Sequence, residues 1–150
     1  METIDLLKKN LLFKGCSAED FELLTGLLQE RQVKPNTTVF SEKMPAEALY
    51  IIKSGKIKIS VMEGEGDEVG LLELGPGEFF GEIALIQESS RAVNARAETA
   101  AELIMLSRKD FLALIDLDPR VAAKITLAIA RLLAMRVKAY SGKLREILLS

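Results

Sequence analysis

The sequence predicts a mainly β fold, a jelly-roll barrel (double-stranded β-helix) flanked by N-terminal helices and a long C-terminal helix. Three observations favour it. Apolar residues near the N-terminus recur at helical spacing, short β-prone runs follow at regular intervals, and a helical pattern then continues to the end. The 150 residues amount to one domain. We divide them into N-terminal helices at 1–30, a β-roll at 31–107 and C-terminal helices at 108–150.

The N-terminal segment is expected to hold two helices. A short one covers residues 3–9, and Gly15 separates it from the second. The run Ser17-Ala-Glu-Asp20 resembles a capping box in which Asp replaces the usual Glu. The apolar residues that follow recur at helical spacing, at Phe21, Leu24, Leu27 and Leu28.

The middle of the chain alternates between strands and turns. In residues 57–61, isoleucine and valine alternate with lysine and serine, which is typical of a half-buried strand. Gly64-Glu-Gly66 predicts a hairpin loop after it. Further β-prone runs lie at 37–40, 49–52, 69–74, 91–97 and 102–106. Short strands at this spacing favour a closed or double-layered β structure.

Two helices are expected to close the chain. Ser107-Arg-Lys-Asp110 resembles a second capping box, and Asp118-Pro119 places a cap residue before a proline in the first helical turn. A helix from Pro119 to about Leu149 would be roughly 45 Å long at 1.5 Å per residue. We therefore expect its far end to project beyond the body, with a weak point at Ser141-Gly142.

This long helix has two distinct faces. Apolar residues spaced alternately by four and three form a seam typical of coiled coils, at Thr126, Ala130, Leu133, Val137, Tyr140, Leu144 and Ile147. A polar stripe, which we interpret as a solvated outer face, consists of Lys124, Arg131, Lys138 and Arg145. A projecting apolar seam must be covered, so the sequence predicts a homodimer through this helix. The alternative is that the seam packs on the chain's own body.

Composition excludes several chemistries. The chain has no histidine, so imidazole cannot act as a base or a metal ligand, and the single Cys16 allows neither an internal disulfide nor a thiolate zinc site. Residues 119–150 hold seven Lys and Arg against one Glu, a net of +6, which leaves −8 for residues 1–118. This acidic body argues against direct nucleic-acid binding. We expect no signal peptide, no membrane segment and a reducing, cytoplasmic location.

The stretch from Gly75 to Ile86, Gly-Pro-Gly-Glu-Phe-Phe-Gly-Glu-Ile-Ala-Leu-Ile, carries the chemistry together with Arg91. Its glycines allow unusual backbone angles and close approach of a ligand. A short helix beginning near Gly81 would direct free backbone N–H groups outward, where anions bind. The planar guanidinium of Arg91 suits bidentate phosphate recognition. Glu82 beside a phosphate would accept a hydrogen bond from a neutral group such as a sugar hydroxyl.

The run Phe80-Gly-Glu-Ile-Ala-Leu-Ile86, followed after four residues by Arg91-Ala92, resembles the phosphate-binding cassette of cyclic nucleotide-binding domains, of the catabolite activator and cyclic AMP-dependent kinase regulatory subunit type. Residues 49–59 resemble the family's central strands, and the terminal helix resembles its C-helix. The resemblance implies a regulatory sensor domain and not an enzyme. Such a domain would bind a cyclic nucleotide and signal through its C-terminal helix.

The resemblance also implies roles for single residues. Gly81 and Ala84 would offer backbone N–H groups to the cyclic phosphate, and Ile83 belongs to the same ligand-binding set. Glu82 would accept the ribose 2′-hydroxyl. Arg91 would pair with the exocyclic phosphate oxygens, assisted by the N–H of the next residue.

Other positions bear on the rest of the ligand. The resemblance implies that Leu71, Phe80 and Val93 line the cavity and that Arg136 lies near the base. Family members that prefer cyclic GMP often have Thr or Ser where this chain has Ala92. We therefore expect cyclic AMP as the ligand, with cyclic GMP as the weaker alternative.

Two other interpretations remain open, and a third is disfavoured. Glu82 and Arg91 could form an ion pair that bridges two strands without a ligand. Alternatively, the chain could be a degenerate jelly-roll module that has lost the ligand and serves only in dimerisation. A metal-dependent cupin enzyme would need clustered histidines, and the chain has none. The chain departs from the family at Glu42-Lys43-Met44, where Glu-Gly-Asp is usual, so we expect a different turn there. No effector segment is recognised in these residues, so the downstream partner is unknown.

Overall fold

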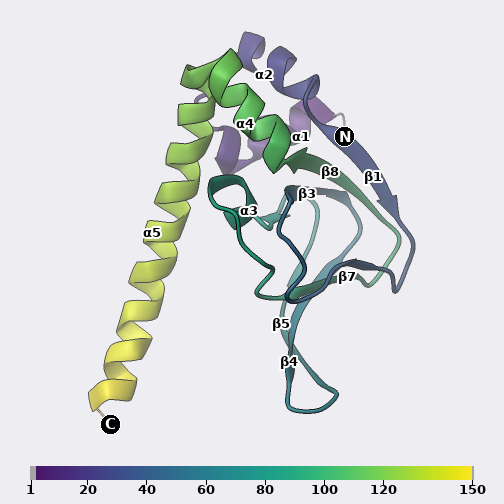
Figure 1. The fold of residues 1–150 in the computed structure, drawn as a ribbon, viewed down its shortest axis with the longest axis vertical. Helices are drawn as coiled ribbons and strands as arrows, with labels where there is room; N and C mark the ends of the chain where they lie inside the picture. Colours follow the sequence, from purple (N-terminus) through teal and green to yellow (C-terminus); the bar gives the residue numbers. More distant parts are fainter. Residues whose placement is uncertain (1–2, 150) are drawn as a thin grey trace.

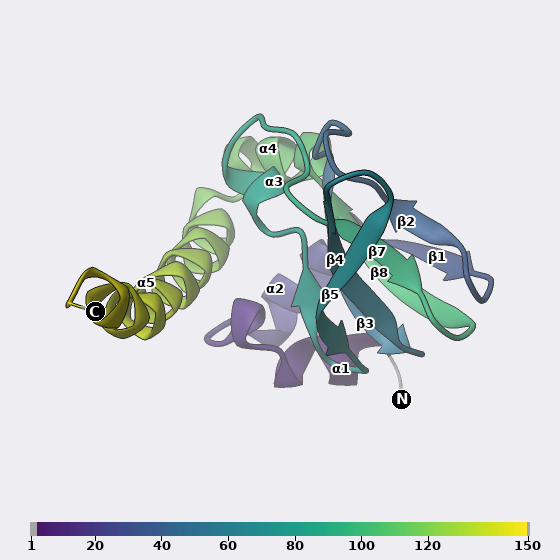
Figure 2. The same ribbon diagram turned by 90° about the horizontal axis from the view of Figure 1, so that it is seen from below.

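The computed structural model describes residues 3–149, with the side chains of 139, 140 and 143–149 left out. Two antiparallel sheets pack face to face, and helices cover one side of the pair (Figures 1 and 2). In chain order the elements are α1 (Thr3–Lys9), η1 (Leu11–Phe13), α2 (Ala18–Thr25), β1 (Gln29–Val33), β2 (Thr38–Phe40), β3 (Ala48–Ser54), β4 (Ile57–Glu63), β5 (Asp67–Leu74), β6 (Phe79–Phe80), α3 (Ile83–Ile86), β7 (Asn94–Ala97), β8 (Ala101–Ser107), α4 (Arg108–Leu117) and α5 (Pro119–Leu149).

The two sheets have the strand orders β1-β8-β3-β6 and β2-β7-β4-β5. This double-layered antiparallel arrangement agrees with the predicted jelly roll and its flanking helices. The mainly β prediction fits only in part, because strands hold 33% of the residues and helices 39%. The excess of helix has a plain cause, since α5 alone contributes 31 residues.

Strand β3 separates two apolar cores. Tyr50 and Ile52 belong to the cluster between the sheets, whereas Leu49 and Ile51 belong to the cluster under the helices. All four side chains are buried, so β3 is covered on both faces. This double burial fixes the backbone of β3, one of whose carbonyl groups borders the site described below.

Local capping signals produce the predicted helix starts. The Ser17 hydroxyl accepts from the Asp20 N–H, and the Asp20 carboxylate accepts from the Ser17 N–H in return. At the start of α5, the Asp118 carboxylate accepts from the Val121 N–H. The expected weak point in α5 was wrong, because the helix runs on through Ser141.

Helix α5 packs on the body over its first turns and then leaves it (Figure 1). Val121, Ile125 and Ile129 are buried under the helices. Further along, Val137 is 67% exposed. None of the helices within residues 3–149 combines the length and apolarity that a membrane crossing requires.

The interpretation of the polar stripe on α5 was wrong at one end. The ammonium group of Lys124 donates to the carboxylate of Asp20 across 2.9 Å, and Asp20 is only 4% exposed. This ion pair ties α5 to α2. Arg131 and Lys138 are exposed as expected, and the side chain of Arg145 lies outside the described residues.

Candidate functional site

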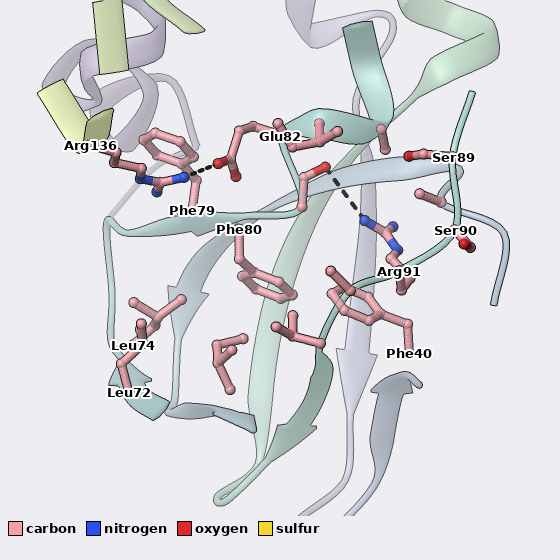
Figure 3. Close-up of a pocket in the computed structure, with 17 residues that line it drawn as sticks. Phe40, Leu72, Leu74, Phe79, Phe80, Glu82, Ser89, Ser90, Arg91 and Arg136 are labelled. Atoms are coloured by element: carbon pink, nitrogen blue, oxygen red, sulfur yellow. Dashed lines mark hydrogen bonds and ion pairs between the residues drawn. The ribbon is translucent and has the colours of Figure 1, made fainter. Parts of the chain in front are cut away.

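A cavity of about 370 Å³ opens beside α3 (Figure 3). Its walls come from both sheets, from α3, from the loop that leads to β7, and from Arg136 on α5. A cavity of this size lies within the range of small-molecule sites. Most of its lining residues are apolar, and its charged side chains, those of Glu82, Arg91 and Arg136, lie toward the α3 end of the cavity (Figure 3).

Arg91 is the cation of the cavity. Its side chain is buried, with 8% of the residue exposed. Nη2 donates to the carbonyl oxygen of Ala48 across 2.7 Å, and Nη1 makes a longer contact of 3.5 Å with the carbonyl oxygen of Gly81. The guanidinium carbon lies 4.0 Å from the centre of the Phe40 ring, a cation–π geometry. The Nε–H has no acceptor among the described residues.

The charge of Arg91 is not neutralised within the described part of the chain. No carboxylate there lies within 4.0 Å of its guanidinium. Burial lowers the pKa of Arg91, and the ionisable groups of Tyr50, Glu47 and Glu82 oppose that effect. Because a buried charge without a partner is destabilising, this arrangement is expected where an anion completes the site.

Gly81 allows Arg91 to come this close. It has φ +80°, in the region that favours glycine. A Cβ at this position would lie 2.7 Å from Nη1 of Arg91 and 3.0 Å from the carbonyl oxygen of Ala48. The glycine therefore serves both the backbone turn before α3 and the packing of the guanidinium.

The short helix α3 begins beside this guanidinium. Its first residue, Ile83, has a backbone N–H that donates to no described residue. The N–H of Ala84, which the resemblance assigned to a phosphate, instead donates to the Gly81 carbonyl across 3.2 Å. This bond closes the turn that starts α3. Within the described residues, the N–H groups of Gly81 and Glu82 also have no acceptor, so the free donors precede Ala84 and include Gly81.

Glu82 pairs with α5 and not with Arg91. Glu82 is 5% exposed, and its carboxylate accepts from Nη1 of Arg136 (Figure 3). The ion pair between Glu82 and Arg91 that was left open above does not form. Glu82 instead links the loop before α3 to the long helix.

A strap at residues 43–46 holds the loop that carries Arg91. The Lys43 N–H donates to the Arg91 carbonyl across 2.9 Å, and the Arg91 N–H donates to the Met44 carbonyl across 2.7 Å. The Ala46 N–H donates to the Ser89 carbonyl across 2.8 Å. The unusual turn noted in the sequence is thus part of this strap. Its Lys43 adopts φ +71° although it is not a glycine.

The structure brings together nine of the ten residues predicted for the site. The nine that line the cavity are Phe80, Gly81, Glu82, Ile83, Ala84, Arg91, Ala92, Val93 and Arg136. Leu71 does not line it and is 51% exposed. Ile59 pairs with Leu72 and Ser60 pairs with Gly70, so Leu71 falls in a bulge between them. The bulge shifts the register, and Leu72 lines the wall instead.

Sequence reasoning missed other lining residues, among them Phe40, Ile59, Leu72, Leu74, Phe79, Ser89 and Ser90. The alternation in β4 identified Ile59 as an inward residue, which was the available signal. The two serines carried no signal, because a loop has no periodicity that orients its side chains.

Comparison with known proteins agrees with this geometry. Residues 30–118 match the family model of the cyclic nucleotide-binding domain. The chain is 36% identical over 125 residues to the cyclic AMP receptor protein of Thermus thermophilus, which covers 83% of this chain and 58% of that protein. The crystal structure of the Thermus thermophilus catabolite activator protein superposes with a TM-score of 0.81 at 33% identity, covering 92% of this chain and 63% of that one.

A third relative is of another kind. Glutaminase 1 of Bradyrhizobium diazoefficiens is 31% identical over 142 residues, which cover 95% of this chain and only 22% of the glutaminase. The chain spans less than two thirds of the length of each of these three relatives. With the fold, the cassette and the family match in agreement, the chain belongs to the cyclic nucleotide-binding domain family.

Proposed function

We propose that this chain is a regulatory sensor domain that binds cyclic AMP in the cavity beside α3. The observation that carries the proposal is the buried guanidinium of Arg91, which has a free Nε–H and no carboxylate partner within the described residues. A cyclic nucleotide carries one negative charge at its phosphate. One arginine and a free backbone N–H at Ile83 match that charge and its oxygen acceptors.

The rest of the cavity accommodates the rest of the nucleotide. The carboxylate of Glu82 is within the same wall and can accept the ribose 2′-hydroxyl. Apolar side chains of Ile59, Leu74 and Val93 offer a surface for the base. Ala92 brings no hydroxyl for the amino group of guanine, which favours cyclic AMP over cyclic GMP.

Arg136 offers a route from the ligand to α5. In the structure it donates to the carboxylate of Glu82, the acceptor that a ribose hydroxyl would need. A bound ribose hydroxyl would therefore compete with Arg136 for the Glu82 carboxylate. Weakening this contact would free Arg136 to move toward the base. Because Arg136 sits on the part of α5 that leaves the body, the contact would transmit occupancy to the projecting helix.

The exposed part of α5 supports dimerisation with a second copy. Ala130 and Val137 of the seam are exposed, together with Met135, which is 64% exposed. Leu133 of the seam instead packs against the core under the helices. Thr126, the first residue of the seam, is also exposed. The other seam side chains, Tyr140, Leu144 and Ile147, lie outside the described residues.

The proposal also covers catalysis, nucleic-acid binding, cellular location and the downstream effector. Two of the relatives named above are a cyclic AMP receptor protein and a catabolite activator protein, which supports a role without catalysis of its own. The acidic body supports the proposal that the domain does not bind nucleic acid directly. The single Cys16 supports a reducing, cytoplasmic location. The downstream effector would be another protein or segment that responds to α5.

Calorimetric titration with cyclic AMP, with Arg91→Lys as the variant, tests the proposal. Lysine keeps the charge but lacks the planar fork, so we expect the affinity to fall by about tenfold or more. Arg96→Lys is the matched control, because Arg96 pairs with Glu68 outside the cavity. An affinity for Arg91→Lys within about threefold of wild type contradicts the role of Arg91. A chain that binds neither cyclic nucleotide would support the degenerate module instead.

A further inference from the structure

The hydroxyl of Ser89 is a polar group of the cavity that no motif explains. Ser89 lines the cavity and is half-buried. Figure 3 shows it directed from its loop toward α3, on the same side of the cavity as the Arg91 guanidinium. No described residue forms a hydrogen bond with this hydroxyl. It is therefore available to a ligand.

The backbone fixes the position of Ser89. Its carbonyl accepts from the N–H of Ala46 across 2.8 Å, and the next residue, Ser90, pairs with Pro45 in an isolated β-bridge. The following N–H, that of Arg91, donates to Met44. The backbone that carries this hydroxyl is thus held in a paired segment, so little further ordering of the backbone is needed when a ligand binds.

The donors of Arg91 leave room for another group. Nη2 is already committed to the Ala48 carbonyl, and Nη1 contacts the carbonyl of Gly81. A cyclic phosphate exposes two exocyclic oxygens that share one negative charge. The free Nε–H and the remaining Nη hydrogens of Arg91 can donate to one exocyclic oxygen of such a phosphate. A second donor, directed at the other exocyclic oxygen, would complete the hydrogen bonding of the phosphate.

We propose that the Ser89 hydroxyl donates a hydrogen bond to one exocyclic oxygen of the cyclic phosphate, while Arg91 contacts the other. This inference rests on the proposed function and adds a binding residue to it. Its consequence is stereochemical, because two different donors would then distinguish the two exocyclic oxygens. Sulfur, a weak acceptor, replaces one oxygen or the other in the two phosphorothioate diastereomers of cyclic AMP.

The test is calorimetric titration of wild type, Ser89→Ala and Ser89→Thr with cyclic AMP and with each diastereomer. We expect Ser89→Ala to lower the affinity for cyclic AMP by about fivefold to tenfold, with Ser89→Thr restoring most of it through its own hydroxyl. We also expect Ser89→Ala to change the ratio of the two diastereomer affinities by about threefold or more. Ser54→Ala, at the end of β3 and outside this cavity, is the control.

Each outcome separates the two proposals. If wild type binds cyclic AMP and Ser89→Ala binds it within about twofold, the role of Ser89 is wrong and the proposed function stands. The role of Ser89 is also wrong if Ser89→Ala lowers the affinities for both diastereomers by the same factor, since a loss of local structure would have the same effect. If wild type binds no cyclic nucleotide, both proposals fail.

Discussion

Substituting Gly81 by alanine tests how backbone and guanidinium are packed together. The new Cβ would lie 2.7 Å from Nη1 of Arg91, well inside an ordinary contact, and 3.0 Å from the carbonyl oxygen of Ala48. The β3 backbone is buried on both faces and cannot yield, so the guanidinium must move. It would then lose its place over Phe40 and its alignment with a bound phosphate.

The Gly81→Ala substitution is expected to have two effects, one on stability and one on affinity. A non-glycine residue at φ +80° lowers the free energy of unfolding by about 1–2 kcal/mol. For a chain of this size that corresponds to a fall in melting temperature of roughly 2–8 °C. Losing a charge-assisted hydrogen bond removes about 1.5–3 kcal/mol of binding free energy. The affinity for cyclic AMP should therefore fall by roughly tenfold to a hundredfold.

Gly77→Ala is the matched control. Gly77 has a similar φ of +86°, but a Cβ there would meet no atom within 4 Å. It should lose a similar amount of stability and retain its affinity. Thermal unfolding and calorimetric titration of both variants separate the two effects. The reasoning is refuted if Gly81→Ala binds cyclic AMP within about threefold of wild type, or if Gly77→Ala loses as much affinity.

Three further predictions concern other parts of the chain. Lys43→Gly should raise the free energy of unfolding by about 0.5–1 kcal/mol, because it relieves the positive φ; a loss of stability in denaturant titration contradicts this. The N–H of Ser17 and the ammonium of Lys124 lower the pKa of Asp20, so its ionised form contributes stability above about pH 4 that is lost as pH falls through the lower folded-state pKa. Asp20→Asn should therefore be less stable than wild type at pH 7, and a difference that persists unchanged into strong acid contradicts it. Val137→Glu should convert a dimer to a monomer in light scattering, whereas a monomeric wild type at micromolar concentration contradicts the dimer itself.

Local signals in the sequence predicted much of this fold. A serine followed three residues later by an acid fixed the start of α2, because the capping bonds join residues three apart. Alternation of apolar and polar residues identified β4, and proline after Asp118 marked the start of α5. The cassette residues were predicted as a group because their spacing is specific to one family.

The features that the sequence did not predict depend on interactions between residues that are not neighbours in the chain, or on irregularities in strand pairing. The bulge at Leu71 changes which face its side chain takes, and alternation alone cannot reveal an inserted residue. The pairs Asp20–Lys124 and Glu82–Arg136 join residues far apart in the chain, so only the packing of α5 on the body brings them together. Helical periodicity predicted a face for Lys124 but not the neighbour that meets it.

The most direct test of the account is calorimetric titration of the wild-type chain with cyclic AMP, cyclic GMP and open-chain AMP side by side. We predict one site per chain, with cyclic AMP bound more tightly than cyclic GMP and AMP bound most weakly. Absence of binding heat for both cyclic nucleotides at millimolar concentration, together with an unchanged melting temperature, would contradict the central claim that the buried Arg91 binds a cyclic phosphate.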